Sequence, residues 1–394
     1  MLYWLFNDYF AHEARTLRMG GAAVLSFLLV ILLGPAMIRW LIRKKVGDKP
    51  EFDHMTLNEL TKGKVNTPTM GGILIVLAIF VSVLLFADLQ NMYIRMALLA
   101  LLWLGTLGGI DDWLKLRKLR KVESKGGDKD GKGDRHGLHM WEKILFQIGL
   151  AVLLSHFMYE YGDQSSVPIL RGDNAQAEIA SPAHRFYIPF IVAPFVVGAL
   201  AHAVITVLTV VGASNAVNLS DGMDGLCSGC MILVTLVFLV VSLVVGLGQW
   251  SAALSMQFVP ESLEMTILCC AMIGACLGFL WYNTHPAQVF MGDTGSLTLG
   301  GLIGFIAVVV RQEALLLIAG GVFVIEALSV IMQVSVYKAT KGRNGLKGKR
   351  LFRCAPLHHH FHLGGWAETK VVGRFWILGA IFAATALAML KWKV

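Results

Sequence analysis

The chain has 394 residues, of which 56% are hydrophobic and 15% are charged, and its mean hydropathy is +0.65. Soluble domains usually carry about 25% charged residues, so this composition excludes an ordinary soluble globular protein and predicts an all-α integral membrane protein. The formal charge of +8 at pH 7 does not imply a nucleic-acid polymer as partner, because in a membrane protein the placement of Lys and Arg matters more than their number.

Apolar runs long enough to cross a bilayer recur along the chain. They lie at 20–42, 70–88, 92–112, 141–160, 187–213, 225–248, 265–283, 296–311, 314–338 and 372–391. We therefore expect about ten transmembrane helices in one polytopic domain that covers residues 1–394. The segment from about 117 to 140 is rich in Lys, Gly and Asp, which predicts a flexible cytoplasmic loop.

The basic residues predict the orientation of these helices. Most Lys and Arg follow the first, third and ninth helices, and the positive-inside rule makes those joins cytoplasmic. By parity, the short joins after the fifth and seventh helices are cytoplasmic too, although they contain no Lys or Arg. All the polar clusters described next then share one face, where we expect an active-site cleft.

Two clusters lie in the first third of the chain. Near the start of the second helix, Lys64 and Thr69 accompany glycines, a combination that suits an anionic ligand, although helix capping and a turn explain it almost as well. At the end of the third helix, Asp111 and Asp112 precede Lys115. Asp111 and Lys115 could form a structural pair, but an acid in hydrocarbon costs about 2.5–3.5 kcal/mol, which favours a role in holding a cation or proton.

A third cluster joins the fifth and sixth helices. Asn215, Asn218, Asp221 and Asp224 recur at every third position, so on a tight helical turn we expect their side chains to point roughly the same way. Such a surface would bind a cation and phosphate. The alternative interpretation is a polar loop whose Asn and Asp cap the next helix.

A fourth cluster lies between the seventh and eighth helices and includes Asn283 and Asp293. We expect Ser296 to be the N-cap of the eighth helix, whose free N–H groups would attract phosphate while Asp293 shares a divalent ion with it. A simple turn fits the Gly-Asp-Thr-Gly sequence equally well.

Histidines form the fifth cluster, in the last cytoplasmic join. His358, His359 and His360 are consecutive and cannot all reach one metal from a regular helix or strand, so they fit contacts with phosphate or sugar oxygens better than a zinc site. Within the helices, Glu326 and His202 stand out. Each is either a functional residue or a structural hydrogen-bonding group between helices.

In this order and on one face, the clusters resemble the polyprenyl-phosphate N-acetylhexosamine phosphate transferase superfamily. Its shared motifs correspond to Asp111-Asp-x-x-Lys115 and to 215–226. A narrower resemblance, to the phospho-N-acetylmuramoyl-pentapeptide transferase family, is carried by the segments 67–72, 289–297, 320–326 and 355–361.

That resemblance implies a ten-helix enzyme of the bacterial inner membrane, a homodimer embedded in membrane lipid, with its active site on the cytoplasmic face. It implies Mg²⁺-dependent transfer of phospho-N-acetylmuramoyl-pentapeptide from UDP-N-acetylmuramoyl-pentapeptide to undecaprenyl phosphate. The products would be lipid I and UMP, in the first membrane step of peptidoglycan synthesis.

The resemblance also implies roles for individual residues. Asp293 is the expected Mg²⁺ ligand, and Asp111, Asp112, Asp293 and His358 are the expected catalytic residues. The residues expected to bind substrate are Lys64, Thr69, Lys115, Lys143, Asn215, Asn218, Asp221, Asp224, Asn283, His359 and His360.

Two alternatives remain at this stage. One is a sibling transferase that uses another amino sugar, and the other is an ion-coupled transporter. A transporter would place carboxylates near mid-membrane on several helices, whereas here they gather at one surface. Within the transferase reading, the acceptor phosphate has a second pKa of about 6 and is already ionised, so we expect Asp111 to act by positioning and electrostatics more than as a base.

Overall fold

The computed structural model describes residues 14–44, 67–124, 137–164, 185–188, 194–254, 256–341 and 348–390. The longer helices are α2 (Ala14–Arg43), α4 (Gly72–Phe86), α5 (Met92–Ser124), α6 (Met140–Gln164), α7 (Ala199–Leu219), α8 (Leu226–Gly246), α10 (Met265–Asn283), α11 (Gly292–Val309), α13 (Gly321–Thr340) and α15 (Glu368–Met389). Shorter elements are α9 (Gly248–Ala253), η3 (Pro260–Glu264), α12 (Glu313–Ala319), α14 (Leu357–Leu363) and an antiparallel strand pair, β1 (Arg185–Phe186) with β2 (Phe195–Val196).

The all-α membrane fold is confirmed for the described part of the chain. Eight of its helices are long and apolar enough to cross a membrane, and α4 is apolar but has only 15 residues. The predicted number of ten spans is not confirmed, although each of the ten apolar runs contains a helix.

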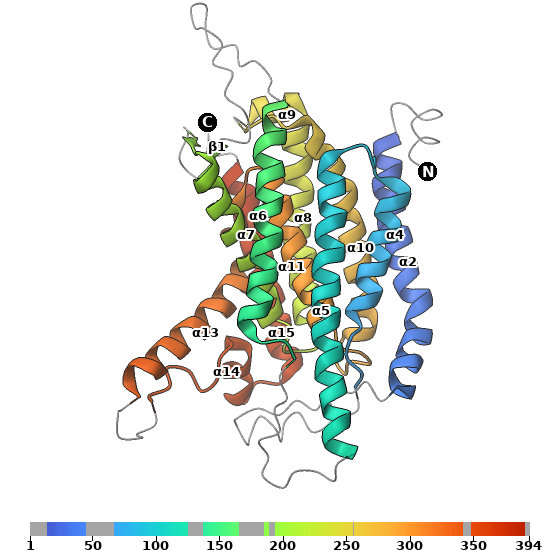
Figure 1. The fold of residues 1–394 in the computed structure, drawn as a ribbon, viewed down its shortest axis with the longest axis vertical. Helices are drawn as coiled ribbons and strands as arrows, with labels where there is room; N and C mark the ends of the chain where they lie inside the picture. The colour runs from blue at the N-terminus through green and yellow to red at the C-terminus, as the bar shows by residue number, and fades with distance from the viewer. Residues whose placement is uncertain are drawn as a thin grey trace, which may run out of the picture.

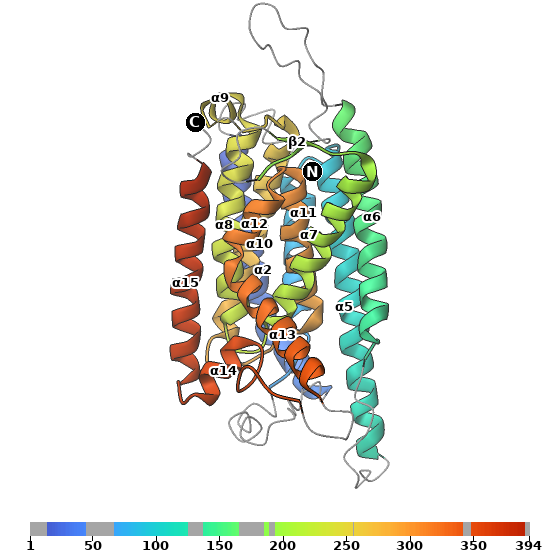
Figure 2. The same cartoon turned by 90° about the vertical axis from the view of Figure 1, so that its left-hand side faces the viewer.

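Helices α10 and α11 form the centre of the bundle. Their most apolar windows are 72% and 89% buried, whereas those of α2 and α15 are each 28% buried and face outward. Helix α10 packs against α2 and α8, and α11 packs against α5 and α7. A helix that is apolar all round belongs in the interior, which is where Figures 1 and 2 show these two helices.

The first turn of α2 and the last turn of α15 lie at the same end of the bundle, the upper end in Figures 1 and 2. Helix α14 lies at the opposite end, together with the joins α7–α8 and α10–α11. This arrangement agrees with the parity argument that placed all the polar clusters on one face.

Three predicted boundaries were wrong. Helix α7 begins at Ala199 and not near 187, because strands β1 and β2 precede it and prolines at 189 and 194 disfavour a helix there. The run 314–338 is broken at Gly320 into α12 and α13, and adjacent glycines weaken a helix at that point. Figure 1 shows α13 leaning away from the other helices.

The third concerns the bounds of the predicted flexible loop, whose flexibility stays a prediction. Helix α5 continues to Ser124, because Lys, Arg and Leu in this stretch are good helix formers, and α6 already begins at Met140. Only residues 125–136 of the predicted loop lie outside the described residues.

Candidate active site

Carboxylates and lysines from three helices meet at the lower end of the bundle. Asp111 of α5 lies 2.7 Å from the Nζ of Lys143 in α6 and 2.8 Å from the Nζ of Lys115. Asp293, in the first turn of α11, lies 2.7 Å from Lys143 Nζ and 3.3 Å from Lys115 Nζ. The sequence prediction that these residues belong to one site is consistent with this geometry.

Asp112 has a different environment from its neighbour Asp111. Its Oδ1 accepts a hydrogen bond from the backbone N–H of Asp293 at 3.2 Å, and its Oδ2 accepts from the N–H and the hydroxyl of Thr294 at 3.0 and 2.7 Å. Asp112 therefore satisfies the free N–H groups at the start of α11, as an N-cap side chain does within one helix.

This finding corrects the N-cap prediction for Ser296. Helix α11 begins at Gly292, so Ser296 lies inside it, and its hydroxyl donates to the carbonyl of Gly292 at 2.9 Å. The capping group comes from another helix, which a sequence pattern within α11 cannot indicate.

Close backbone contact brings α5 to the start of α11. A Cβ at Gly108 would collide with the backbone of Asp293 and Thr294, so only glycine lets the two helices approach this closely. On the other side, the backbone N–H groups of Gly71 and Gly72 donate to the carbonyls of Phe290 and Met291, both at 2.8 Å.

These backbone bonds also determine the position of Thr69. Phe290 N–H donates to the carbonyl of Pro68 at 2.8 Å, and the Thr69 hydroxyl lies beside Gly292. Thr69 is thus next to the start of α11, as a residue of the predicted site should be. Lys64 lies outside the described residues.

Asp221 adds a further acid to the cluster from the join between α7 and α8. Its carboxylate lies near the backbone N–H of Gly292, and its pKa is raised well above the ordinary value by burial and by the nearby carboxylates of Asp293 and Asp112. Like charges at close range favour protonation or the presence of a cation.

The cluster has the chemistry of a divalent-cation site. One oxygen each from Asp111, Asp112 and Asp293 lies within 4.8 Å of the others, and oxygen donors of this kind suit Mg²⁺ and similar hard cations. Asp221 is a further acid close by, so the positive charges of the two lysines do not neutralise the negative charges of the carboxylates. The residues present therefore fit a bound divalent metal ion.

The side chains of 215–224 do not converge as the sequence analysis predicted. Asn215 donates to Gln147 Oε1 in α6 at 2.7 Å and to the carbonyl of Val211 at 2.8 Å, whereas Asp221 faces Gly292. Helix α7 is α-helical up to Leu219. In an α-helix, side chains three positions apart are rotated relative to one another around the helix axis, so they do not point in one direction. Asn218 is partly buried in the last turn of α7 and is closer than Asn215 to the α7–α8 join that contains Asp221.

Asp224 takes part in a second cluster, with His285 and Glu368. Its Oδ2 lies 3.0 Å from His285 Nδ1 and accepts a hydrogen bond from Ala287 N–H at 3.1 Å. The backbone N–H of Asp224 donates to Glu368 Oε1 at 3.0 Å. One atom from each of the three side chains lies within 4.8 Å of the others.

Sequence reasoning assigned no role to His285 or Glu368. They are separated from Asp224 by 61 and 144 positions, and no spacing rule connects such distant residues. Asn283 was predicted, and its Oδ1 accepts from Gly225 N–H while its amide donates to Val289 O, each at 2.9 Å. These contacts connect the joins α7–α8 and α10–α11.

The three histidines of α14 lie in different environments. His358 is fully buried and His359 is nearly so, and their rings lie against Gly222 in the α7–α8 join. His360 accepts a hydrogen bond at Nδ1 from the backbone N–H of Arg353 at 3.1 Å. The three imidazoles do not form a common metal site with Cys354 among the described residues.

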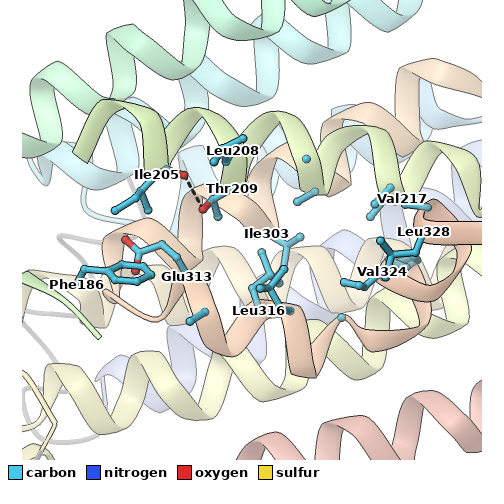
Figure 3. Close-up of a pocket in the computed structure, with 18 residues that line it drawn as sticks. Phe186, Ile205, Leu208, Thr209, Val217, Ile303, Glu313, Leu316, Val324 and Leu328 are labelled. Atoms are coloured by element: carbon cyan, nitrogen blue, oxygen red, sulfur yellow. Dashed lines mark hydrogen bonds between the residues drawn. The ribbon is translucent and has the colours of Figure 1, made fainter. Parts of the chain in front are cut away.

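The bundle contains a cavity of about 370 Å³ whose lining is almost entirely apolar. Helices α7, α11, α12 and α13 line it, and Figure 3 shows Glu313 and Phe186 at one end and Val217, Val324 and Leu328 at the other. Val217 lies in the last turn of α7, so this end of the cavity is at the end of the bundle that carries the α7–α8 join.

Comparisons with a family model and with curated proteins agree with each other. Residues 129–311 match the family model described as glycosyl transferase family 4. A phospho-N-acetylmuramoyl-pentapeptide-transferase from Desulfotalea psychrophila is 42% identical over 95% of this chain and 93% of its own length. Proteins of the same name from Koribacter versatilis and Rickettsia bellii are each 39% identical over 99% of this chain and 100% and 98% of their own lengths.

Proposed function

The chain belongs to the phospho-N-acetylmuramoyl-pentapeptide-transferase family, and from this membership we infer that it transfers phospho-N-acetylmuramoyl-pentapeptide from its uridine diphosphate carrier to undecaprenyl phosphate. The products are lipid I and UMP. The observation that best supports this chemistry in the structure is the group of carboxylates and lysines at the start of α11.

We propose that Asp293, with Asp111 and Asp221 nearby, holds Mg²⁺. When bound, the ion would supply positive charge to the diphosphate of the donor, which is the main requirement of phosphoryl transfer. Lys115 and Lys143 lie next to these carboxylates and would hold the phosphates of the two substrates in line for attack.

Asp111 then acts by positioning. Its Oδ1 accepts a hydrogen bond from Leu138 N–H at 2.7 Å, and its Oδ2 lies against both lysine ammonium groups. These contacts orient the Asp111 carboxylate toward the two lysines, and the acceptor phosphate, with a second pKa of about 6, needs no base near neutral pH. Asp112 holds the first turn of α11 through its hydrogen bonds and so determines the position of Asp293.

The apolar cavity suits part of the polyprenyl chain of the acceptor. Its lining is almost entirely hydrophobic, and its Val217 end lies at the same end of the bundle as the acidic cluster, so a chain in the membrane could lie there while its phosphate reaches Lys115 and Lys143. We further propose an inner-membrane location with the site facing the cytoplasm, supported by the basic residues of α5 near that end and the positive-inside rule. A homodimer is expected from the resemblance.

The donor can be tested directly. UMP release is measured in detergent with Mg²⁺, undecaprenyl phosphate, and either UDP-N-acetylmuramoyl-pentapeptide or UDP-N-acetylglucosamine. Activity with the muramoyl-pentapeptide donor alone is expected. Activity with UDP-N-acetylglucosamine alone would contradict the proposed substrate and favour a sibling transferase.

A further inference from the structure

Glu326 is a fully buried acid in α13 that the proposed mechanism does not use. Its Oε1 accepts a hydrogen bond from the backbone N–H of His358 at 3.2 Å, and its Oε2 lies 3.2 Å from the Nδ1 of the same residue. Both oxygens of one carboxylate therefore face one histidine. An acid this far from water is unfavourable without such a partner.

The other side of the His358 ring meets the join between α7 and α8. A Cβ at Gly222 would collide with His358 Nε2 and would come within 3.3 Å of His359 Nε2. The imidazole therefore lies directly against the backbone of Gly222, which follows Asp221 directly and precedes Asp224 by two positions. Both ring nitrogens of His358 are buried without a hydrogen-bond partner among the described residues, so the 3.2 Å approach of Nδ1 to Glu326 Oε2 is a close contact and not a hydrogen bond.

Glu326, His358 and Gly222 thus form a continuous contact from the interior of α13 to the acidic join. The Glu326 carboxylate lies against one edge of the ring and so limits the orientations that the ring can take. With Nδ1 facing Glu326, it is Nε2 that faces the join. The position of the ring in turn limits where the backbone of Gly222 can lie.

We propose that Glu326 is a positioning residue that acts through His358 to hold the 220–225 join, and with it Asp221 and Asp224, in place for the nucleotide donor. The last step rests on the proposed function, because it takes these two acids to lie beside the donor. The contact itself does not depend on that function.

Hydrogen exchange of the purified protein tests the positioning step without any substrate. In Glu326→Gln the side chain keeps its size and an acceptor oxygen but loses its charge, so peptides covering 220–225 should exchange faster than in the wild type. Glu264→Gln is the matched control, since Glu264 pairs with Arg18 at 2.6 Å, away from this join. Unchanged exchange at 220–225 in Glu326→Gln would overturn the proposal.

Kinetics test the consequence for the donor. We expect Glu326→Gln to raise the KM for the nucleotide donor about tenfold, which corresponds to the loss of one buried polar contact, and to leave the KM for undecaprenyl phosphate nearly unchanged. A purely structural role would change both constants or only the yield of folded protein.

A double variant shows whether the effect passes through His358. If it does, Glu326→Gln should add little to the defect of His358→Gln, because the two substitutions remove the same contact. Fully multiplicative defects would contradict the proposal. If the wild type releases no UMP from the donor, the proposed function fails, while the exchange experiment still decides whether Glu326 positions the join.

Discussion

Two neighbouring carboxylates in α5 have different tasks because their side chains leave the helix in different directions. Asp111 faces Lys115 and Lys143, whereas Asp112 accepts three hydrogen bonds from the first turn of α11. The sequence predicted that both belong to the site. It could not separate their roles, because the groups that decide them lie in α6 and α11.

For Asp111, the proposed positioning role predicts a specific pH behaviour. Asp111→Asn keeps an acceptor for Leu138 N–H but removes the charge beside the lysines, so we expect a rate lower by about 10²-fold. The deficit should persist as the pH is raised, because the acceptor phosphate is already ionised above its pKa of about 6. A pH–rate profile of UMP release measures this. Full recovery at high pH would show that Asp111 is a general base.

For Asp112, the hydrogen bonds to α11 predict a loss of stability. Asp112→Ala removes the acceptor for Asp293 and Thr294 and should reduce stability by about 2 kcal/mol, visible as a lower Tm in detergent. Ser296→Ala, which removes a single hydrogen bond within α11, is the comparison and should cost about 1 kcal/mol or less. A higher Tm for Asp112→Ala would mean that repulsion among the carboxylates outweighs these hydrogen bonds.

At the scale of elements, the site depends on how closely α4, α5 and α11 approach one another. The apolar runs predicted most helices of the core, because burial in a bilayer requires long apolar segments. They could not predict the break between α12 and α13 or the strands before α7, since local Gly and Pro effects compete there with overall hydrophobicity. The contact between Gly108 and Asp293 is likewise visible only in the structure.

Because of that contact, we expect the addition of a single methyl group at position 108 to reduce activity. Gly108→Ala would push α5 away from the backbone of Asp293, so we expect destabilisation by about 1–3 kcal/mol and a large fall in UMP release. Gly149→Ala in α6 is the matched control. No atom lies within 4 Å of a Cβ at that position, so this change should be neutral or slightly stabilising. Normal activity in Gly108→Ala would show that the close approach is unnecessary.

At the scale of the molecule, polar groups lie together at one end of the bundle. They come from α5, α6, α11, α14 and the joins α7–α8 and α10–α11. The positive-inside pattern and the motif order predicted that these groups share a face. The clusters built from residues far apart in the chain, such as Asp224 with His285 and Glu368, could not be predicted. Their geometry depends on packing between helices that sequence periodicity does not specify.

The apolar cavity predicts a difference between long and short acceptors. Ala327→Trp would fill part of it from α13, so the KM for undecaprenyl phosphate should rise about tenfold, equivalent to about 1.4 kcal/mol. The KM for farnesyl phosphate, which has a much shorter chain, should change little. Ala384→Trp on the exposed face of α15 serves as the control. Equal effects on both acceptors would place the polyprenyl chain elsewhere.

The central claim is that Asp293 holds a divalent cation at the start of α11. The most direct measurement is UMP release from UDP-N-acetylmuramoyl-pentapeptide and undecaprenyl phosphate as a function of Mg²⁺ concentration, for the wild type and for Asp293→Ala. We expect chelation to stop the wild-type reaction, added Mg²⁺ to restore it, and the variant to stay inactive at every Mg²⁺ concentration. A variant that remains active with the same Mg²⁺ dependence as the wild type would contradict the account.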